Sequence, residues 1–428
     1  MNRIEVFAGD RLGNYPINMS GDNMKCVLQG ISSKGEQIYV PFDETLLSKH
    51  VLLLGGIGTG KTNALFQMVC QLKANMRPDD IMVIFDTKGD FYKEFYMNGD
   101  VVISNDSTAT DYWNVFKEIQ EEEKQEEIIL EISKAFFEEK IKNTNQPFFP
   151  SAAKDIFSAI LLCFFRSGEK NKLNNQALAD FLHSATGEEL RALLDQYPDL
   201  KGMKSYIFDD RSPQTQGVLA ELQQFSRELF IGNFKKKGSL GIQELIQKKG
   251  GKTVFIEYDL GIGNLLTPIY SLLYDLAIKK ALSRNEGENR GNVYFVADEF
   301  RLLPNLKHIA DAVNFGRSLG VKFMIGIQNV EQIYEVYGEE NARSIMSGFS
   351  TNISFRVNDA KSRDYIQGLY GKNRKKEVFM SAIRGKGITE QITDGNVVED
   401  WDISRLRIGE AVIGLPGTAP FTFQFQEY

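Results

Sequence analysis

Residues 51–62 read VLLLGGIGTGKT, an apolar strand-like run that leads directly into a glycine-rich turn with a lysine and a threonine. The glycines let backbone N–H groups turn inward around phosphate oxygens, Lys61 neutralises the β- and γ-phosphates, and Thr62 ligates Mg²⁺. The pattern GxxxxGK[ST] therefore predicts a P-loop between a strand and a helix. Its expected nucleotide-binding residues are Gly55, Gly56, Gly58, Thr59, Gly60, Lys61 and Thr62.

The sequence around this turn alternates short apolar runs with helix-like stretches. A helix-like stretch over 62–76 is followed by the runs IMVIFD and VVIS. After residue 250 the pattern returns in TVFIEYD, NVYFVADE, VKFMIGIQ and TNISFRV, with helix-like stretches at 267–283 and 306–319. Apolar runs of this length separated by helices predict an α/β fold with a mostly parallel central sheet, buried on both faces.

The middle of the chain has a different pattern. Residues 118–140 and 153–165 place apolar side chains at helical spacing, and little strand signal lies near them. We therefore expect an all-α domain inserted at 110–250 between two parts of the α/β domain, 46–109 and 251–428. Short alternating segments predict β hairpins in residues 1–45, packed on the α/β core.

A pair of carboxylates, Asp298 and Glu299, ends the apolar run NVYFVA. Mg²⁺ requires an oxygen ligand opposite the Thr62 hydroxyl, and hydrolysis requires a base that orients water near the γ-phosphate. We expect Asp298 to serve the metal and Glu299 the water. Gln328, which ends the next apolar run, is expected to contact the γ-phosphate and sense it, with a capping or surface amide as the structural alternative.

Asp86 ends the apolar run that follows the P-loop helix, in the turn DTKGD. Ligands collect outside the carboxyl ends of parallel strands, so Asp86 is a candidate for binding the nucleotide. An equally good interpretation is that its carboxylate only shapes the turn.

Composition excludes several classes of protein. The 428 residues include 50 Lys and Arg against 57 Asp and Glu, a formal net charge of −7, and 42% of them are hydrophobic. The apolar share is enough for a core, which excludes a disordered or collagen-like chain. The negative charge argues against binding nucleic acid through bulk charge, although a local basic channel is compatible with it.

Cysteines and histidines give no metal or disulfide pattern. Cys26, Cys70 and Cys163 are far apart and form no CxxC pair, and the three histidines show no zinc-ligand spacing. The N-terminus lacks the apolar run of a signal peptide, and apolar runs such as 160–165 are far shorter than the roughly 20 residues that span a bilayer. We expect a cytoplasmic protein that reaches the inner face of a membrane only through a partner.

Three basic stretches are candidates for contact with nucleic acid. They are Lys235-Lys236-Lys237, Arg374-Lys375-Lys376, and Arg384 with Lys386. Basic loops that follow a phosphate backbone bind without sequence preference, but a solvated surface patch is the favoured interpretation of each stretch. Residues 373–400 are polar and contain glycine, which predicts a long mobile loop.

Several motifs in this order resemble one family, the coupling ATPases of conjugative DNA transfer and type IV secretion. This TraD/TraG-like group lies within the HerA/FtsK class of RecA-like motors. The resemblance covers about residues 48–428 and rests on HVLLLGGIGTGKT, IMVIFDTKGDFY, VYFVADEFRLLPNL, GRSLGVKFMIGIQNVEQIYEVYG and LRIGEAVIGLPGTAPF. It implies a RecA-like P-loop NTPase with an inserted all-α domain, and ATP and Mg²⁺ as cofactors.

The resemblance also implies partners. Family members form hexameric rings, bind ATP between subunits, and move DNA or recruit relaxase-bound DNA and effector proteins. An arginine from the neighbouring subunit usually stabilises the transition state. Arg343 is the only arginine of the expected helix 339–348, Arg356 on the next strand is its rival, and Met346 stands where the arginine is expected.

One departure is that most members carry N-terminal transmembrane helices, and this sequence shows none. Docking on a membrane-embedded secretion component, or use in genome processing or defence, would account for it. Two hypotheses follow: an ATP-driven motor that translocates or recruits DNA, and an ATP-controlled adaptor that recruits protein cargo through its all-α domain. The carboxylate pair argues against a third, a nucleotide-binding scaffold without hydrolysis.

Overall fold

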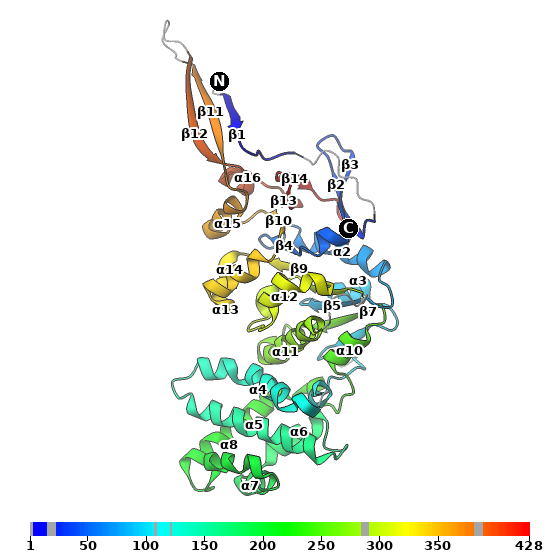
Figure 1. The fold of residues 1–428 in the computed structure, drawn as a ribbon, viewed down its shortest axis with the longest axis vertical. Coiled ribbons are helices and arrows are strands. Elements are labelled where there is room, and N and C mark those ends of the chain that lie inside the picture. Colours follow the sequence, from blue (N-terminus) through cyan, green and yellow to red (C-terminus); the bar gives the residue numbers. More distant parts are fainter. Residues whose placement is uncertain (1–2, 15–22, 107–108, 120–121, 284–290, 381–387) are drawn as a thin grey trace. The chain divides into compact units, whose positions relative to one another are not determined.

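The computed structural model describes residues 3–14, 23–106, 109–119, 122–283, 291–380 and 388–428 (Figure 1). The chain divides into two compact units. The first comprises Met1–Met82, Glu286–Leu302 and Ile309–Tyr428, and the second comprises Val83–Asn285 and Leu303–His308. The boundary between them falls within strand β5 (Ile81–Asp86), which contributes residues to both.

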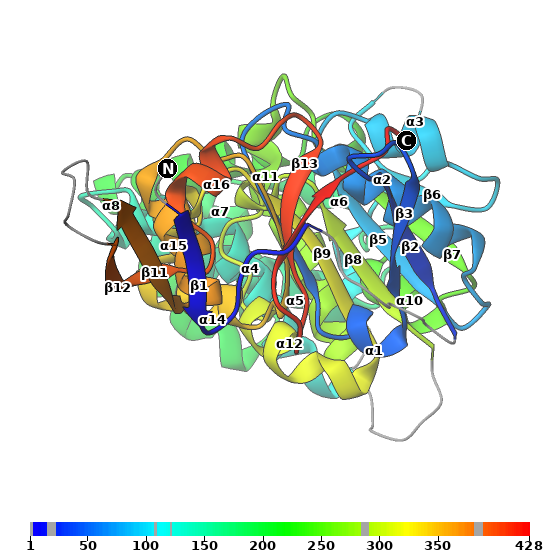
Figure 2. The same ribbon diagram turned by 90° about the horizontal axis from the view of Figure 1, so that it is seen from above.

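The first unit is built on six strands in the order β14-β13-β10-β4-β9-β8, and Figure 2 shows β9 beside β8. Strands β10, β4, β9 and β8 are parallel, whereas β13 and β14 run antiparallel at one edge. Every residue of the four parallel strands is buried, which explains why β4, β8 and most of β9 are apolar without alternation. The strands are β4 (Val51–Leu54), β8 (Val293–Ala297), β9 (Val321–Ile327), β10 (Thr351–Phe355), β13 (Glu410–Gly414) and β14 (Phe421–Gln424).

Helices connect these strands. They are α1 (Glu44–Leu47), α2 (Lys61–Ala74), α12 (Ile309–Phe315), α13 (Val330–Tyr337), α14 (Glu339–Ser347), α15 (Ala360–Tyr370) and α16 (Asp400–Ser404), with 3₁₀ turns η4 (Phe300–Leu302) and η5 (Gly316–Leu319). The mostly parallel sheet with helical connections confirms the predicted α/β class.

The N-terminal segments only partly match the prediction of hairpins. Strands β2 (Cys26–Ile31) and β3 (Gln37–Phe42) form an antiparallel hairpin, and Gln71 of α2 accepts from the N–H of Val27 and donates to its carbonyl. Strand β1 (Arg3–Ala8) instead pairs antiparallel with β11, more than 360 residues away in the sequence. Local alternation cannot show which distant strand supplies the partner.

The prediction of a long mobile loop over 373–400 is wrong for the described part of that segment. Strands β11 (Lys372–Met380) and β12 (Ile388–Asn396) form an antiparallel ribbon, and β1 completes a three-stranded sheet in the order β1-β11-β12. Lysines of β11 face carboxylates: Lys376 pairs with Glu390 of β12 at 2.7 Å, and Lys375 pairs with Glu399. Cross-strand ion pairs stabilise this polar ribbon. Its strands lack the apolar alternation from which strands are predicted in a sequence.

The second unit contains a small sheet and many helices. Its strands lie in the order β5-β7-β6, and β6 is parallel to β7. Its elements are α3 (Asp90–Phe95), β6 (Val101–Ile103), η1 (Val115–Glu118), η2 (Glu122–Lys124), α4 (Gln125–Lys142), α5 (Phe148–Ser167), α6 (Asn175–Ser184), α7 (Gly187–Asp195), η3 (Pro198–Ile207), α8 (Pro213–Leu229), α9 (Gly232–Lys235), α10 (Ile242–Lys248), β7 (Lys252–Glu257) and α11 (Gly263–Leu282). The described residues between β6 and β7 contain helices and no strand, whereas the domain boundaries at 110 and 250 stay a prediction.

Helix α5 corrects the expectation that no apolar segment approaches the length of a membrane span. Among the described residues it is the one helix long and apolar enough to cross a bilayer, but 67% of that stretch is buried inside the protein. Aromatic side chains contribute to this burial: Phe157 of α5 packs against Phe136 of α4 and against Phe225 of α8. Such burial is typical of a core helix. Length and composition alone do not distinguish a core helix from a membrane-spanning helix.

Glu118 shows why the helix predicted from residue 118 begins later, at Gln125. Its side chain is fully buried in η1, where Oε1 accepts hydrogen bonds from the Trp113 indole at 2.8 Å and from the Ile242 N–H at 2.7 Å. Oε2 accepts from the Gln243 N–H at 3.2 Å, so the carboxylate caps the start of α10. Burial raises the pKa of Glu118 to about 7, against hydrogen bonds that lower it.

We predict that the stability of the second unit falls as pH rises from about 4.5 to about 7. In this range the unfolded chain ionises Glu118 while the folded protein holds its proton, so folding is opposed by up to about 3 kcal/mol, at about 1.4 kcal/mol per pKa unit. Urea unfolding followed by Trp113 fluorescence, in a Trp401→Phe background, measures this.

The control compares how the free energy of unfolding changes with pH in two variants and in the wild type. Glu118→Gln has no titrating group, so its stability relative to wild type rises across this pH range, whereas the exposed Glu139→Gln variant follows the wild type. Parallel curves for wild type and Glu118→Gln would contradict the assignment.

Candidate nucleotide-binding site

The glycine-rich turn joins β4 to α2, as the sequence predicts. Gly60 is the N-cap of α2 and has φ of +116°, a left-handed conformation that side chains disfavour. A Cβ at Gly60 would also lie 3.1 Å from Cα of Gly409. Both the backbone conformation and this close contact therefore favour glycine at position 60. The first turn of α2 therefore presents its N–H groups to the loop, the arrangement that binds phosphate.

Hydrogen bonds from distant segments hold the loop in place. Thr59 donates its hydroxyl to the Gly56 carbonyl at 2.8 Å, and its own carbonyl accepts from the Gly409 N–H at 2.9 Å. The Gly56 N–H donates to the carbonyl of Arg356 at 3.0 Å. The loop is thus preorganised by β10 and by the segment before β13.

Lys61 is buried at the start of α2 and its ammonium lies over the loop. Nζ lies 2.5 Å from the carbonyl of Gly55 and 3.1 Å from that of Gly56. An ammonium carries three donors, so it can exchange one of these carbonyls for a phosphate oxygen without leaving the loop. This position fits the predicted role of Lys61.

Thr62 and Asp298 meet, although 236 residues separate them. The Thr62 hydroxyl donates to Oδ2 of Asp298 at 2.8 Å. The approach depends on Gly326 of the intervening strand β9, because a Cβ there would lie 2.3 Å from the Asp298 carbonyl oxygen. A hydroxyl and a carboxylate at this separation are the hard oxygen ligands that Mg²⁺ takes, so the pair fits the predicted metal site.

Glu299 is held by two side chains. Its Oε2 accepts from Nε2 of Gln328 at 2.5 Å, and its Oε1 lies 2.9 Å from Nε of Arg301. Gln328 follows β9, so the structure brings together the three residues expected at the ends of β8 and β9. Sequence reasoning missed Arg301, although its place two residues after Glu299 is the signal that could have found it.

Comparison with known proteins identifies the family. Residues 37–422 match the family model described as the type IV secretion-system coupling protein DNA-binding domain. The chain belongs to the type IV coupling protein family. The match therefore confirms the resemblance to conjugative coupling ATPases that the sequence motifs predict.

Curated relatives are distant in sequence. The chain is 23% identical over 329 residues to the coupling protein TraD of Escherichia coli K12, covering 75% of this chain and 43% of TraD. It is 23% identical over 340 residues to the coupling protein VirD4 of Bartonella henselae, covering 75% of this chain and 53% of VirD4. This chain thus spans about half the length of these relatives.

Solved structures share the fold. The bacterial conjugative coupling protein TrwBdeltaN70, in its unbound form, superposes with a TM-score of 0.75 at 20% identity over 95% of this chain and 90% of that chain. The plasmid coupling protein TrwB solved with ADP and Mg²⁺ superposes with a TM-score of 0.71 at 20% identity, over 99% and 95%. This likeness confirms the RecA-like P-loop fold.

The two candidate arginines belong to different elements of the fold. Arg343 is exposed on α14 and pairs with Glu339 at 2.5 Å, and Met346 of the same helix is buried. Arg356 is exposed after β10, with its carbonyl against the P-loop of its own chain. The choice between them stays a prediction.

Asp86 is buried at the end of β5. Its Oδ1 accepts from the Lys88 N–H at 3.2 Å and its Oδ2 from the Tyr92 N–H at 2.9 Å, and burial raises its pKa. These contacts favour the interpretation that Asp86 shapes the turn before α3. Its contact with nucleotide stays a prediction.

Most described side chains of the basic stretches have acidic or aromatic partners. Lys235 pairs with Asp180 at 2.8 Å, and Lys236 lies over the ring of Tyr112. Lys375 and Lys376 pair with carboxylates as described above, and Arg374 lies 3.7 Å from Asp394. Arg384 and Lys386 lie outside the described residues. These pairs favour the surface-patch interpretation for the described stretches.

Replacing the predicted base tests the site. We expect Glu299→Gln to keep nucleotide affinity near wild type and to lose roughly 100-fold or more of ATP turnover, because an amide cannot accept the proton of the attacking water. A fluorescent nucleotide measures binding and phosphate release measures turnover.

Glu340→Gln, at an exposed carboxylate of α14, is the matched control and should change neither quantity. Turnover by Glu299→Gln equal to that of the control would show that Glu299 is not the base.

Proposed function

We propose that this chain is an ATP-driven motor of the coupling-protein type, which translocates or recruits DNA. The observation that carries the proposal is the contact between Thr62 of the P-loop and Asp298, with Glu299 held beside it by Gln328 and Arg301. A scaffold that only binds nucleotide has no use for an oriented carboxylate at this position. The family description as a DNA-binding domain supports the choice of DNA.

The residues of the site divide the chemistry among them. The N–H groups of the P-loop and the Lys61 ammonium bind the phosphates, and Thr62 with Asp298 would hold Mg²⁺, which neutralises charge on the β- and γ-phosphates when bound. Glu299 orients the attacking water and accepts its proton. Because Gln328 donates to Glu299, a nucleotide that engages the amide changes how Glu299 is held, which lets Gln328 sense the γ-phosphate.

We propose that ATP hydrolysis requires an arginine from a neighbouring copy of the chain. In the proposed hexameric ring, Arg343 or Arg356 of one subunit stabilises the transition state in the next. The paired conformation of Arg343 does not exclude it, since an exposed ion pair contributes only about 0–1 kcal/mol and exchanges partners readily.

A second candidate is the ATP-controlled adaptor, and one observation favours it. Arg374, Lys375 and Lys376 of β11 each lie beside a carboxylate, so this basic stretch offers little net positive charge to DNA. An adaptor would use the helices α4–α8 to bind protein cargo, such as a relaxase or an effector, and nucleotide would control assembly.

Steady-state ATP hydrolysis with single- and double-stranded DNA separates the two candidates. The motor predicts several-fold stimulation by DNA of any sequence that weakens steeply with salt, because phosphate contacts release counterions. A ring predicts specific activity that rises with protein concentration.

Lys61→Ala is the blank for this experiment and should show neither basal nor stimulated turnover. Turnover that is indifferent to DNA at every salt concentration, and stimulated only by a protein partner, would reject the motor in favour of the adaptor.

A further inference from the structure

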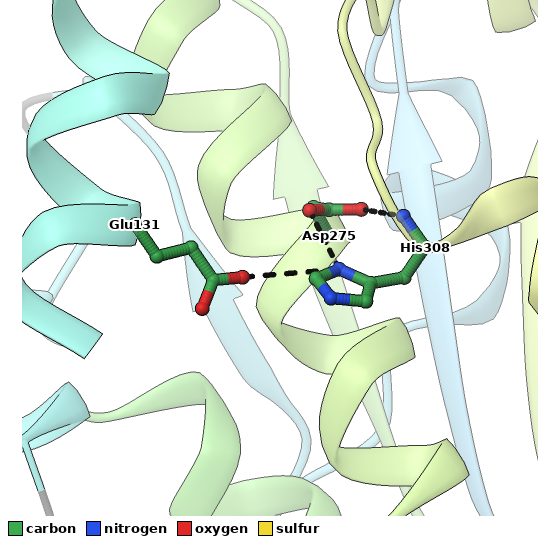
Figure 3. Close-up of side chains that lie close together, drawn as sticks. All are labelled: Glu131, Asp275 and His308. Carbon is green, nitrogen blue, oxygen red and sulfur yellow. Dashed lines mark hydrogen bonds and ion pairs between the residues drawn. The ribbon is translucent and has the colours of Figure 1, made fainter. Parts of the chain in front are cut away.

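Three metal-ligating side chains converge in the second unit, within the helical part of the chain (Figure 3). Glu131 comes from α4, Asp275 from α11, and His308 from the segment 303–308. Nδ1 of His308 lies 2.9 Å from Oδ2 of Asp275 and 3.8 Å from Oε1 of Glu131. The three ligand atoms all lie within 4.8 Å of one another.

The burial of this trio is costly as it stands. The Asp275 side chain is 9% exposed and that of Glu131 is 18% exposed. Oε1 of Glu131 is buried and accepts no hydrogen bond, while the other oxygen pairs with Lys279. A buried carboxylate oxygen without a donor is unfavourable unless something else satisfies it.

The trio also lines a cavity of about 730 Å³. Apolar side chains such as Pro268, Leu272 and Pro304 form part of the same wall. A ligand set that opens onto a cavity leaves room for water or a small ligand at the remaining coordination positions. Structural zinc sites are closed, whereas sites with three protein ligands and an open position bind an exchangeable fourth ligand.

The geometry points to a site for one divalent transition-metal ion of the Zn²⁺ type, bound by Glu131, Asp275 and His308. Ligand atoms around such an ion, at bond lengths of about 2.0–2.2 Å, stand about 3–3.6 Å apart. The two separations from His308 Nδ1, 2.9 and 3.8 Å, lie on either side of that range, and the carboxylate oxygens of Asp275 and Glu131 lie within 4.8 Å of each other. Small rotations of the three side chains would bring their ligand atoms to the separations that a bound ion requires. The unpartnered oxygen of Glu131 then gains a ligand bond.

The donor set selects among cations. One imidazole nitrogen and two carboxylate oxygens suit Zn²⁺, Co²⁺ or Mn²⁺ better than Ca²⁺ or Mg²⁺, which prefer oxygen ligands. In the absence of metal, His308 donates from Nδ1 to the Asp275 carboxylate, so the ion replaces one proton. Lys279 opposes binding, because its charge already neutralises Glu131.

A bound ion would join α4 and α11 to the segment that follows Glu299 in the chain. No sequence motif predicts this site, since the three ligands come from separate segments and only one is a histidine. The inference does not depend on the proposed function.

Zn²⁺ titration of the full chain tests the site. The protein is stripped with a chelator, kept free of nucleotide, and carries Cys70→Ser throughout to remove the one half-buried thiol. Calorimetry should show one Zn²⁺ per chain, and Co²⁺ should give visible absorption bands of a nitrogen and oxygen ligand set. We expect His308→Gln and Asp275→Asn to weaken binding by at least about tenfold.

Two further variants make the result decisive. His183→Gln, at a histidine of α6 outside the trio, should bind as wild type does, and Lys279→Gln should bind several-fold more tightly. No saturable binding, or binding that His308→Gln and His183→Gln weaken equally, would overturn the site. If His308→Gln does not fold, unchanged affinity in Lys279→Gln would overturn it.

Discussion

The hydrogen bond between Thr62 and Asp298 is the contact on which the account of this protein depends. It joins the start of the P-loop helix to the end of β8, across β9. It forms because parallel strands bring their carboxyl ends to one edge of the sheet, and because Gly326 lets the Asp298 backbone approach. The P-loop and the carboxylate pair become one site only through this arrangement.

The features that could be predicted from the sequence are those with a local signal. The P-loop is a strand, a turn with fixed glycines and a helix, so residues 51–62 are sufficient to place it. Asp298, Glu299 and Gln328 could be placed because each ends a buried apolar run, and strand ends in a parallel sheet lie together.

What could not be predicted has its cause in long-range contacts. The pairing of β1 with β11, and the ion pairs that order β11 and β12, follow no apolar periodicity. Glu118 appears in the sequence as the start of a charged helix, yet it is buried because α10 needs a cap 124 residues away. The trio of Glu131, Asp275 and His308 likewise depends on side chains that meet only after folding.

Charge pairing also bears on the proposed contact with DNA. The chain has a net charge of −7 and its described basic stretches largely carry partners, so the proposed binding of DNA requires ion pairs to be exchanged for phosphate contacts. Such exchange is inexpensive for exposed pairs, each contributing about 0–1 kcal/mol. Pairing therefore argues against these stretches as a preformed DNA surface.

The most direct test of the central contact is Mg²⁺-dependent ATP hydrolysis by Thr62→Ser and Thr62→Ala. Serine keeps the hydroxyl beside Asp298, so its turnover should stay within about tenfold of wild type, whereas alanine should lose about 100-fold or more. Equal turnover by the two variants would contradict the account, because the hydroxyl and its contact with Asp298 would then have no part in hydrolysis.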